Sequence, residues 1–121
     1  MTESSPAPEE LRVGADRRTL VVVFPGGARD EFSAEFLRVL SPSAEVQGHS
    51  PDQRKTVGGK KDVAIANILP IGHYAIRIVF SDGHDSGIYT WSYLAELGRE
   101  KDERWRAYLE ELKAKGLKRE R

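Results

Sequence analysis

The sequence predicts an α+β fold, a single domain in which two to three helices pack around a mainly antiparallel sheet with hairpins. Two observations predict the sheet. Residues 74–80 alternate large apolar side chains with other residues, which is typical of a strand with one buried face. Asp82-Gly83 follows and favours a two-residue hairpin turn, so the next strand returns antiparallel. The third observation predicts the helices: apolar residues at helical spacing gather in separate stretches beside the hairpins.

The first third of the chain predicts three strands. Residues 1–10 are rich in Ser, Pro and Glu and offer nothing to bury, so we expect a disordered N-terminal tail. Residues 11–13 predict a short first strand, and the β-branched run at 19–24 predicts a covered second one. Pro25-Gly26-Gly27 then turns the chain into a partner strand at 29–32.

Capping residues mark the predicted helices. Ser33 and Thr90 each stand where an N-cap is needed, before a short helix ending at Ser41-Pro42 and a helix that begins at residue 91. Gly98 is the predicted C′ residue of the second helix, and Gly116 stops a last helix that begins near residue 102. Residues 47–61 predict a long solvated loop, and residues 117–121 are expected to fray.

Charge and cysteine content exclude several classes of function. Nineteen basic and nineteen acidic residues cancel, so no overall field attracts the chain to nucleic acid or to an anionic membrane. The chain has no cysteine, which removes disulfides, thiolate nucleophiles and cysteine ligands for zinc or iron–sulfur clusters. No segment has the pattern of a signal peptide or a membrane span. We therefore expect a cytoplasmic protein with no membrane and no nucleic-acid partner.

Six ordered motifs resemble one protein family. They are Leu37-Arg38, the runs 41–46 and 70–75, Gly48-His49, the Gly59-Lys60 loop and the run 82–91. Together they are similar to the gamma-butyrobetaine hydroxylase N-terminal-like domain, in a stand-alone bacterial form without cysteine. The resemblance implies that this domain occupies residues 11–98 and that residues 99–121 form a C-terminal helix and tail.

The resemblance also carries functional implications. In the hydroxylases this domain precedes a catalytic barrel that holds iron and 2-oxoglutarate, and the sequence has no counterpart of that barrel, so we lean against an enzyme. The family domain binds zinc through three cysteines and a histidine, and the matching positions here are Ser41, Ser43, Val46 and His84. Serine is a poor zinc ligand and valine is none, so we expect this site to be lost and no cofactor to be bound. Related domains fused to Mrp-type iron–sulfur cluster carrier ATPases imply a protein partner, with such a carrier as a candidate.

The corner around His84 is the strongest candidate site. His84 lies at the tip of the predicted hairpin, where side chains meet solvent or partners. With Asp82 and His49 it could form a metal site, because imidazole and carboxylate suit zinc, iron or nickel. A hydrolase triad of His84, Asp85 and Ser86 is disfavoured, because neighbours on a strand point to opposite faces.

A basic loop at 54–61 is the second candidate. It lacks the complete glycine, lysine and hydroxyl pattern of a phosphate-binding loop, so we interpret it as a solvated connection that could grip an anionic partner. The tryptophan that opens the helix after the hairpin either docks that helix or faces a partner. The predicted interaction residues are Arg54, Lys55, Lys60, Lys61, Asp85 and Trp91.

Two hypotheses from different classes remain open. The first is a non-catalytic accessory or interaction domain, linked to iron–sulfur cluster assembly or carrier proteins, whose contact surface is the His84 corner with residues 41–49. The second is a small-molecule or metal-ion binding domain centred on His84. We assign no residue a catalytic role.

Overall fold

The computed structural model describes residues 6–48 and 54–120, and it confirms the α+β class. Within these residues the strands form two antiparallel sheets of three strands each, where one sheet was expected. The first sheet has the order β1-β2-β3 and the second the order β4-β5-β6. The strands are β1 (Glu10–Val13), β2 (Thr19–Val23), β3 (Arg29–Ser33), β4 (Ile65–Ile71), β5 (Ala75–Phe80) and β6 (Ile88–Thr90). The helices are α1 (Ala34–Val39), α2 (Ala44–Gln47), α3 (Trp91–Arg99) and α4 (Lys101–Ala114).

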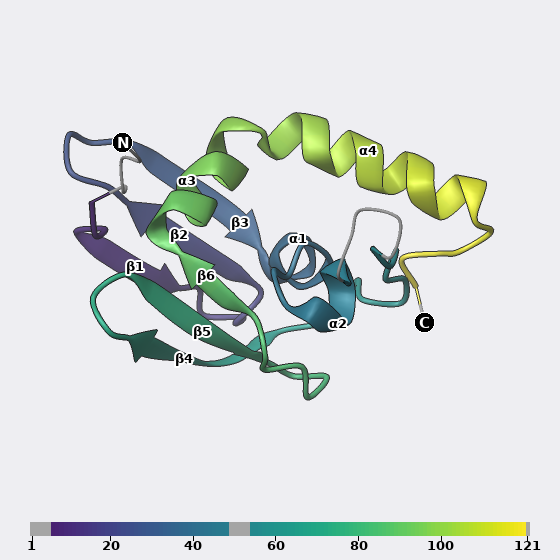
Figure 1. The fold of residues 1–121 in the computed structure, drawn as a ribbon, viewed down its shortest axis with the longest axis horizontal. Helices are drawn as coiled ribbons and strands as arrows, with labels where there is room; N and C mark the ends of the chain where they lie inside the picture. The colour runs from purple at the N-terminus through teal and green to yellow at the C-terminus, as the bar shows by residue number, and fades with distance from the viewer. Residues whose placement is uncertain (1–5, 49–53, 121) are drawn as a thin grey trace.

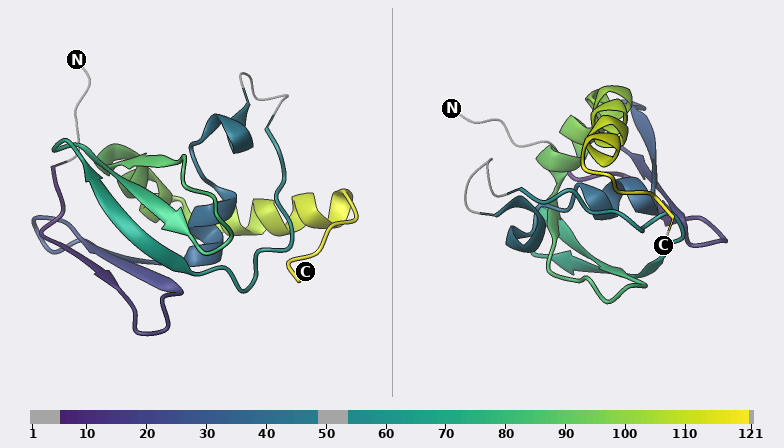
Figure 2. Two further views of the ribbon diagram at one scale, coloured as in Figure 1. Left: turned by 90° about the horizontal axis from the view of Figure 1, so that it is seen from below. Right: turned by 90° about the vertical axis from the view of Figure 1, so that its right-hand side faces the viewer.

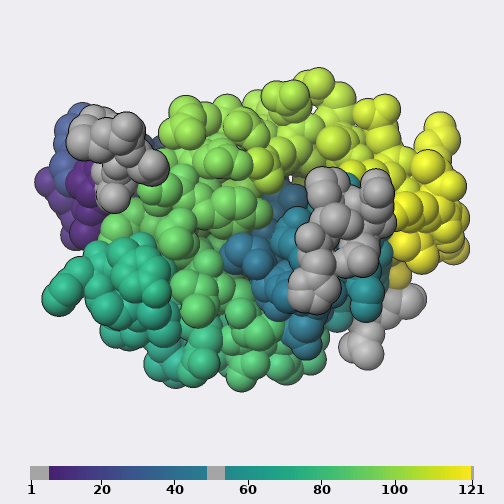
Figure 3. Space-filling model, viewed as in Figure 1, coloured from purple at the N-terminus to yellow at the C-terminus, as the bar shows by residue number. Residues whose placement is uncertain are grey.

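The two sheets lie together at the left of Figure 1, and α1 and α2 lie to their right. Helix α4 runs along the upper edge, above α1 and α2 in this view. The core between these elements consists of inward-facing side chains of both sheets together with α1, α3 and α4. Its most deeply buried members include Leu20, Phe32, Leu37, Ile65, Ile78, Phe80, Tyr89, Leu94 and Leu97. In the space-filling view the second sheet and the helices hide most of the first sheet (Figure 3). Burial of apolar area at roughly 25 cal/mol per Å² is the main force that holds these layers together.

Arg17 joins the two sheets at the start of β4. Its carbonyl accepts the Ile65 amide at 2.7 Å, and its guanidinium donates to the carbonyls of Ile65 and Ala66, each at 2.7 Å. Its φ of 62° places it in the left-handed region, which non-glycine residues rarely adopt. These three bonds therefore fix where the second sheet begins relative to the first.

The predicted N-caps are confirmed. The Ser33 hydroxyl accepts the Phe36 amide at 3.0 Å, and the Thr90 hydroxyl accepts the Tyr93 amide at 3.0 Å. The prediction for Gly98 was wrong, because α3 continues through it to Arg99. Gly98 is needed for close approach instead, since a Cβ there would lie 2.2 Å from a carboxylate oxygen of Asp30.

Three predicted boundaries also differ from the structure. The strand expected to return at 84–89 is limited to Ile88–Thr90, because residues 84–87 leave the ladder to contact α1 and α2. The tail was expected to fray, but residues 117–120 dock on the molecule, with backbone bonds from Gly59 to Lys118 and from Lys61 to Arg119. The solvated loop was expected to lie free, but from Arg54 onward it packs along α4 and this tail.

Across residues 6–48 and 54–120, no helix combines the length and the apolar character needed to span a membrane.

Candidate functional site

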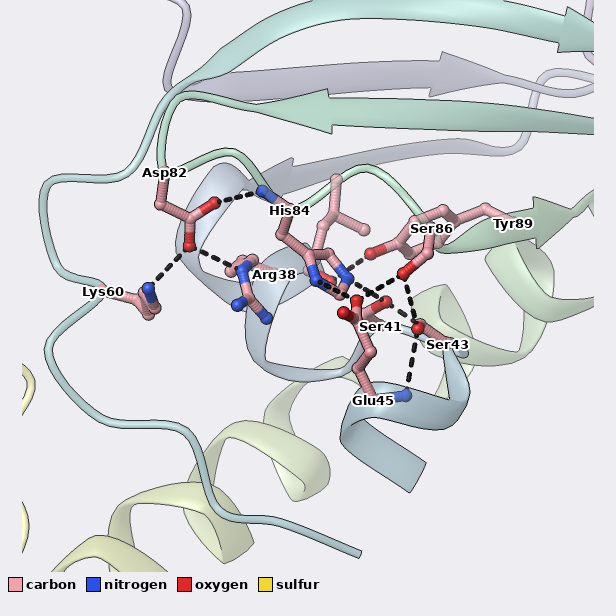
Figure 4. Close-up of polar contacts among 10 residues, drawn as sticks. Arg38, Ser41, Ser43, Glu45, Lys60, Asp82, His84, Ser86 and Tyr89 are labelled. Atoms are coloured by element: carbon pink, nitrogen blue, oxygen red, sulfur yellow. Dashed lines mark hydrogen bonds and ion pairs between the residues drawn. The ribbon is translucent and has the colours of Figure 1, made fainter. Parts of the chain in front are cut away.

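Two segments far apart in the sequence meet at the predicted corner. One is the connection from α1 to α2, residues 40–45, and the other is the loop from β5 to β6, residues 81–87 (Figure 4). The Ser43 hydroxyl caps α2 by accepting the Glu45 amide at 3.1 Å, and this aims the Glu45 side chain at the loop. The loop turns at Gly83, whose φ of 90° suits glycine, and the turn directs His84 inward.

His84 is buried rather than solvated, with 8% of its surface exposed. Its Nε2 lies 2.9 Å from the Ser41 hydroxyl, and its Nδ1 lies 3.2 Å from a Glu45 carboxylate oxygen. Because an ionised carboxylate can only accept, Nδ1 carries the proton and Nε2 accepts from Ser41. The ring also packs against Phe80, with 6.1 Å between the ring centroids. His84 thus ties the loop to α2 and to Ser41, in the connection that leads from α1 to α2.

Two further serines complete the network. The Ser86 hydroxyl donates to Glu45 at 2.6 Å and lies 2.7 Å from the Ser43 hydroxyl. Because the single proton of Ser86 is given to Glu45, Ser43 is the donor in this second bond. The Ser41 oxygen meanwhile accepts the Ser43 amide at 3.2 Å. Each of these hydroxyl groups therefore both donates and accepts within the chain.

The Asp82 carboxylate contacts the backbone of His84 and two cationic side chains, Arg38 and Lys60. One of its carboxylate oxygens lies 2.8 Å from Arg38 Nε and 2.6 Å from Lys60 Nζ, and the other accepts the His84 amide at 3.1 Å. Burial raises the pKa of Asp82, but the bonds from Lys60, the His84 amide and Arg38 outweigh it and lower the pKa to about 2. Asp82 is therefore a charged anchor for α1 and the basic loop.

Burial governs the titration of His84 as well. It lowers the pKa of His84 below the ordinary value, the Arg38 charge lowers it further, and Glu45, Asp82 and Asp85 oppose the shift. The hydrogen bond from Ser86 lowers the pKa of Glu45. At neutral pH the ring is therefore neutral and the carboxylate is charged, as the assigned donors require.

The order Ser41, His84, Glu45 is that of a serine hydrolase triad, but the geometry does not serve catalysis. Ser41 is fully buried, and its oxygen already accepts a backbone amide. Gly87 covers it so closely that a Cβ there would lie 2.4 Å from the hydroxyl oxygen. A nucleophile must reach a substrate carbonyl beside donors for an oxyanion, and Ser41 has no exposed surface from which to do so.

The positions that the family resemblance matches to zinc ligands meet here, but their side chains do not fit zinc. Ser41, Ser43 and His84 come together, and Val46 lies next to them in α2, 2% exposed. Two hydroxyls that already hold hydrogen bonds and an aliphatic side chain cannot replace three thiolates. Among the described residues, no group of three or more His, Cys, Asp and Glu side chains is placed to hold a metal ion.

The other predicted residues are spread over the surface around the corner. Asp85 and Lys55 are exposed, and Lys61 is half exposed beside Glu120. Arg54 and Lys60 are held in ion pairs with Glu111 and Asp82. Trp91 is partly buried and donates to the His73 carbonyl at 2.7 Å. His49 lies outside the described residues.

Sequence reasoning missed Glu45, which provides the central acceptor of the network. The signal was available, because Ser43 followed by an acidic residue two positions later is an N-cap with a favourable first-turn charge. The sequence could not show which residue Glu45 would hydrogen-bond, since Ser86 is 41 positions away from it.

Comparisons with known proteins place the chain in a family. The family model described as gamma-butyrobetaine hydroxylase-like, N-terminal, matches residues 11–95. The chain belongs to this family. Comparison with curated protein sequences gives no match.

Solved structures agree with this assignment. Two solution NMR structures are 41% and 40% identical, cover 97% and 98% of this chain and 92% and 90% of theirs, and give TM-scores of 0.82 and 0.83. A crystal structure of a protein of unknown function from Acidithiobacillus ferrooxidans, in the DUF971 family, is 34% identical. It covers 80% of this chain and 98% of its own, with a TM-score of 0.64.

Proposed function

We propose that this member of the gamma-butyrobetaine hydroxylase-like family is a non-catalytic accessory domain that binds a protein partner. The observation that carries the proposal is the closed network at the corner. Its nucleophile-like hydroxyl, Ser41, is fully buried, and each hydroxyl and ring nitrogen of the network is used within the chain. A corner built in this way holds two segments together and leaves recognition to the surface around it.

The exposed charges beside the corner support recognition of a protein. Asp85 follows His84 in the loop, the Lys55 amide donates to the Val46 carbonyl of α2, and Lys61 follows Lys60, which pairs with Asp82; all three residues are exposed. Charged groups of both signs on a rim favour specific orientation of a partner more than raw affinity. The proposed partner is an iron–sulfur cluster carrier, on the basis of the family resemblance.

Binding to a purified Mrp-type carrier ATPase from the source cell tests the proposal. We expect biolayer interferometry to show saturable binding that Lys55→Glu weakens by about tenfold, roughly 1.4 kcal/mol. Arg99→Glu is the matched control, because it makes the same charge change at an exposed position at the end of α3. The proposed partner is contradicted if no binding is seen at a carrier concentration of about 100 μM, roughly 100-fold above a micromolar Kd, or if both variants weaken binding equally.

Reaction with a serine-directed fluorophosphonate tests the non-catalytic part separately. We expect no labelling of Ser41 in the native chain, because its oxygen is covered by Gly87. Labelling that Ser41→Ala abolishes would show an accessible nucleophile and overturn this part of the proposal.

Metal binding centred on His84 is the second candidate. His84 Nδ1 and a Glu45 oxygen lie 3.2 Å apart, and the Glu45 side chain is 67% exposed, so an ion could displace the shared proton. It takes second place because Asp82 is engaged by two cations. Stoichiometric metal in tag-free protein, lost in His84→Ala, would promote it over the first.

A further inference from the structure

The C-terminal tail, residues 117–120, lies against a surface, here called the groove, that is made by parts of the chain far from it in the sequence. In both views of Figure 2 the end of the chain returns from α4 to run beside the basic loop. The groove is lined by Glu35 of α1, Trp105 of α4 and the backbone of residues 58–61. The network at the corner uses none of these groups, and the proposed partner surface shares only Lys61 with them, whose backbone amide contacts the tail.

Glu35 is the specific element of this groove. It is 4% exposed, and its two carboxylate oxygens accept from Arg119 Nε at 2.9 Å and Nη2 at 2.8 Å. The same guanidinium lies over the Trp105 ring, 5.1 Å from the centroid. A planar fork that binds a buried carboxylate with two bonds and stacks on an aromatic face is a requirement that arginine meets and lysine does not.

The backbone of the basic loop supplies the general element. The amides of Gly59 and Lys61 donate to the carbonyls of Lys118 and Arg119, at 2.8 and 3.0 Å. The loop thus contacts two consecutive carbonyls of the tail through its own backbone, without any side chain. Gly58 is required here, because a Cβ would lie 2.8 Å from the Lys118 carbonyl oxygen. Gly58, one of the two glycines of the basic loop, therefore makes room for the backbone of the tail.

The tail itself is held by few contacts. Leu117 is 41% exposed and Lys118 is exposed, so the side chains that hold the tail are Arg119 and, more weakly, the exposed Glu120, which lies 3.5 Å from Lys61 Nζ. Gly116, with φ of 67°, separates the tail from α4 and ends the helix. A short segment joined in this way to the surface that it contacts has an effective concentration there on the order of millimolar.

We propose that Glu35, Trp105 and the backbone of residues 58–61 form a binding groove for an arginine-bearing peptide segment of a partner protein, and that the C-terminal tail occupies it in cis. Glu35 and Trp105 bind one guanidinium, and the loop amides bind the peptide carbonyls beside it. This inference rests on the proposed function, because it names the partner chemistry of an interaction domain.

A peptide-exchange experiment on the full-length chain tests the groove. The probe is a fluorescein-labelled peptide that copies residues 116–120, Gly-Leu-Lys-Arg-Glu, and the readout is fluorescence anisotropy. We expect the peptide to bind the Arg119→Ala protein at least tenfold more tightly than the wild-type protein, because the substitution removes the cis competitor. A matched peptide with lysine in place of the arginine should bind at least tenfold more weakly, and Glu35→Gln in the Arg119→Ala background should abolish binding.

Several outcomes would overturn the groove. They are no binding to a folded Arg119→Ala chain, equal binding to the wild-type chain, and equal binding of the arginine and lysine peptides. Should Arg119→Ala fail to fold, Arg119→Lys serves instead, since it keeps a charge near Glu35 but not the fork. If the chain binds the carrier but not the peptide, the proposed function stands and only the groove is wrong. If it binds the peptide but not the carrier, the groove stands and the proposed partner is wrong.

Discussion

The bond between Ser41 and His84 predicts a large and specific loss of stability when the ring is removed. In His84→Ala the buried Ser41 hydroxyl loses its acceptor, which costs about 1–3 kcal/mol. Loss of the ring beside Phe80 leaves a void and adds about 1 kcal/mol. We therefore expect the free energy of unfolding to fall by about 2–4 kcal/mol at pH 7.5, and Tm to fall by roughly 10–15 °C for a domain of this size.

Thermal and urea unfolding followed by circular dichroism measure this loss. His73→Ala is the matched control, because it removes the same ring from an exposed position, and we expect it to change stability by less than about 0.5 kcal/mol. A cycle with Ser41→Ala should give a coupling free energy of about 1–2 kcal/mol between the two side chains. If His84→Ala and His73→Ala unfold alike, or if the coupling is zero, the network does not hold the corner.

Three other changes follow from the same contacts. The folded chain lowers the pKa of His84 from 6.5, so the unfolded chain binds a proton on this ring more tightly than the folded chain does. The free energy of unfolding in urea should therefore fall as the pH drops below about 6.5, and it should fall less steeply in His84→Ala. Gly87→Ala should lower stability by about 1–3 kcal/mol, because the new Cβ would displace Ser41, and a Tm equal to wild type would contradict this. Tyr89→Phe should cost about 1–2 kcal/mol by calorimetry, because the buried Leu37 carbonyl loses its donor, and an unchanged Tm would argue against that bond.

Local signals in the sequence were sufficient for most elements of the fold. Caps such as Ser33 and Thr90 act on the next few residues, so their effect is readable without tertiary knowledge. Gly98 could not be read in this way, because its role depends on Asp30, a residue of β3. The docked tail was missed for the same reason, since Arg119 resembles any terminal basic residue until Glu35 lies beneath it.

The sequence predicted which residues gather at the corner, but not their burial or their hydrogen bonds. His84 and the positions Ser41 and Ser43 do meet, as the family resemblance implied. Burial of His84 was not foreseen, because a hairpin tip is normally solvated and only the approach of α1 and α2 covers this one. Arg54 and Lys60 of the basic loop form ion pairs with Glu111 and Asp82, which the sequence could not show, and contact of this loop with a partner stays a prediction.

Long-range ¹H–¹⁵N correlation NMR of the His84 ring tests the closed corner most directly. We predict a neutral ring at pH 7.5 with the proton on Nδ1 and with Nε2 accepting from Ser41, and we predict that one equivalent of Zn²⁺ leaves both nitrogen shifts unchanged. A proton on Nε2, or a shift of either nitrogen on addition of Zn²⁺, would contradict the closed network and favour a metal site at His84.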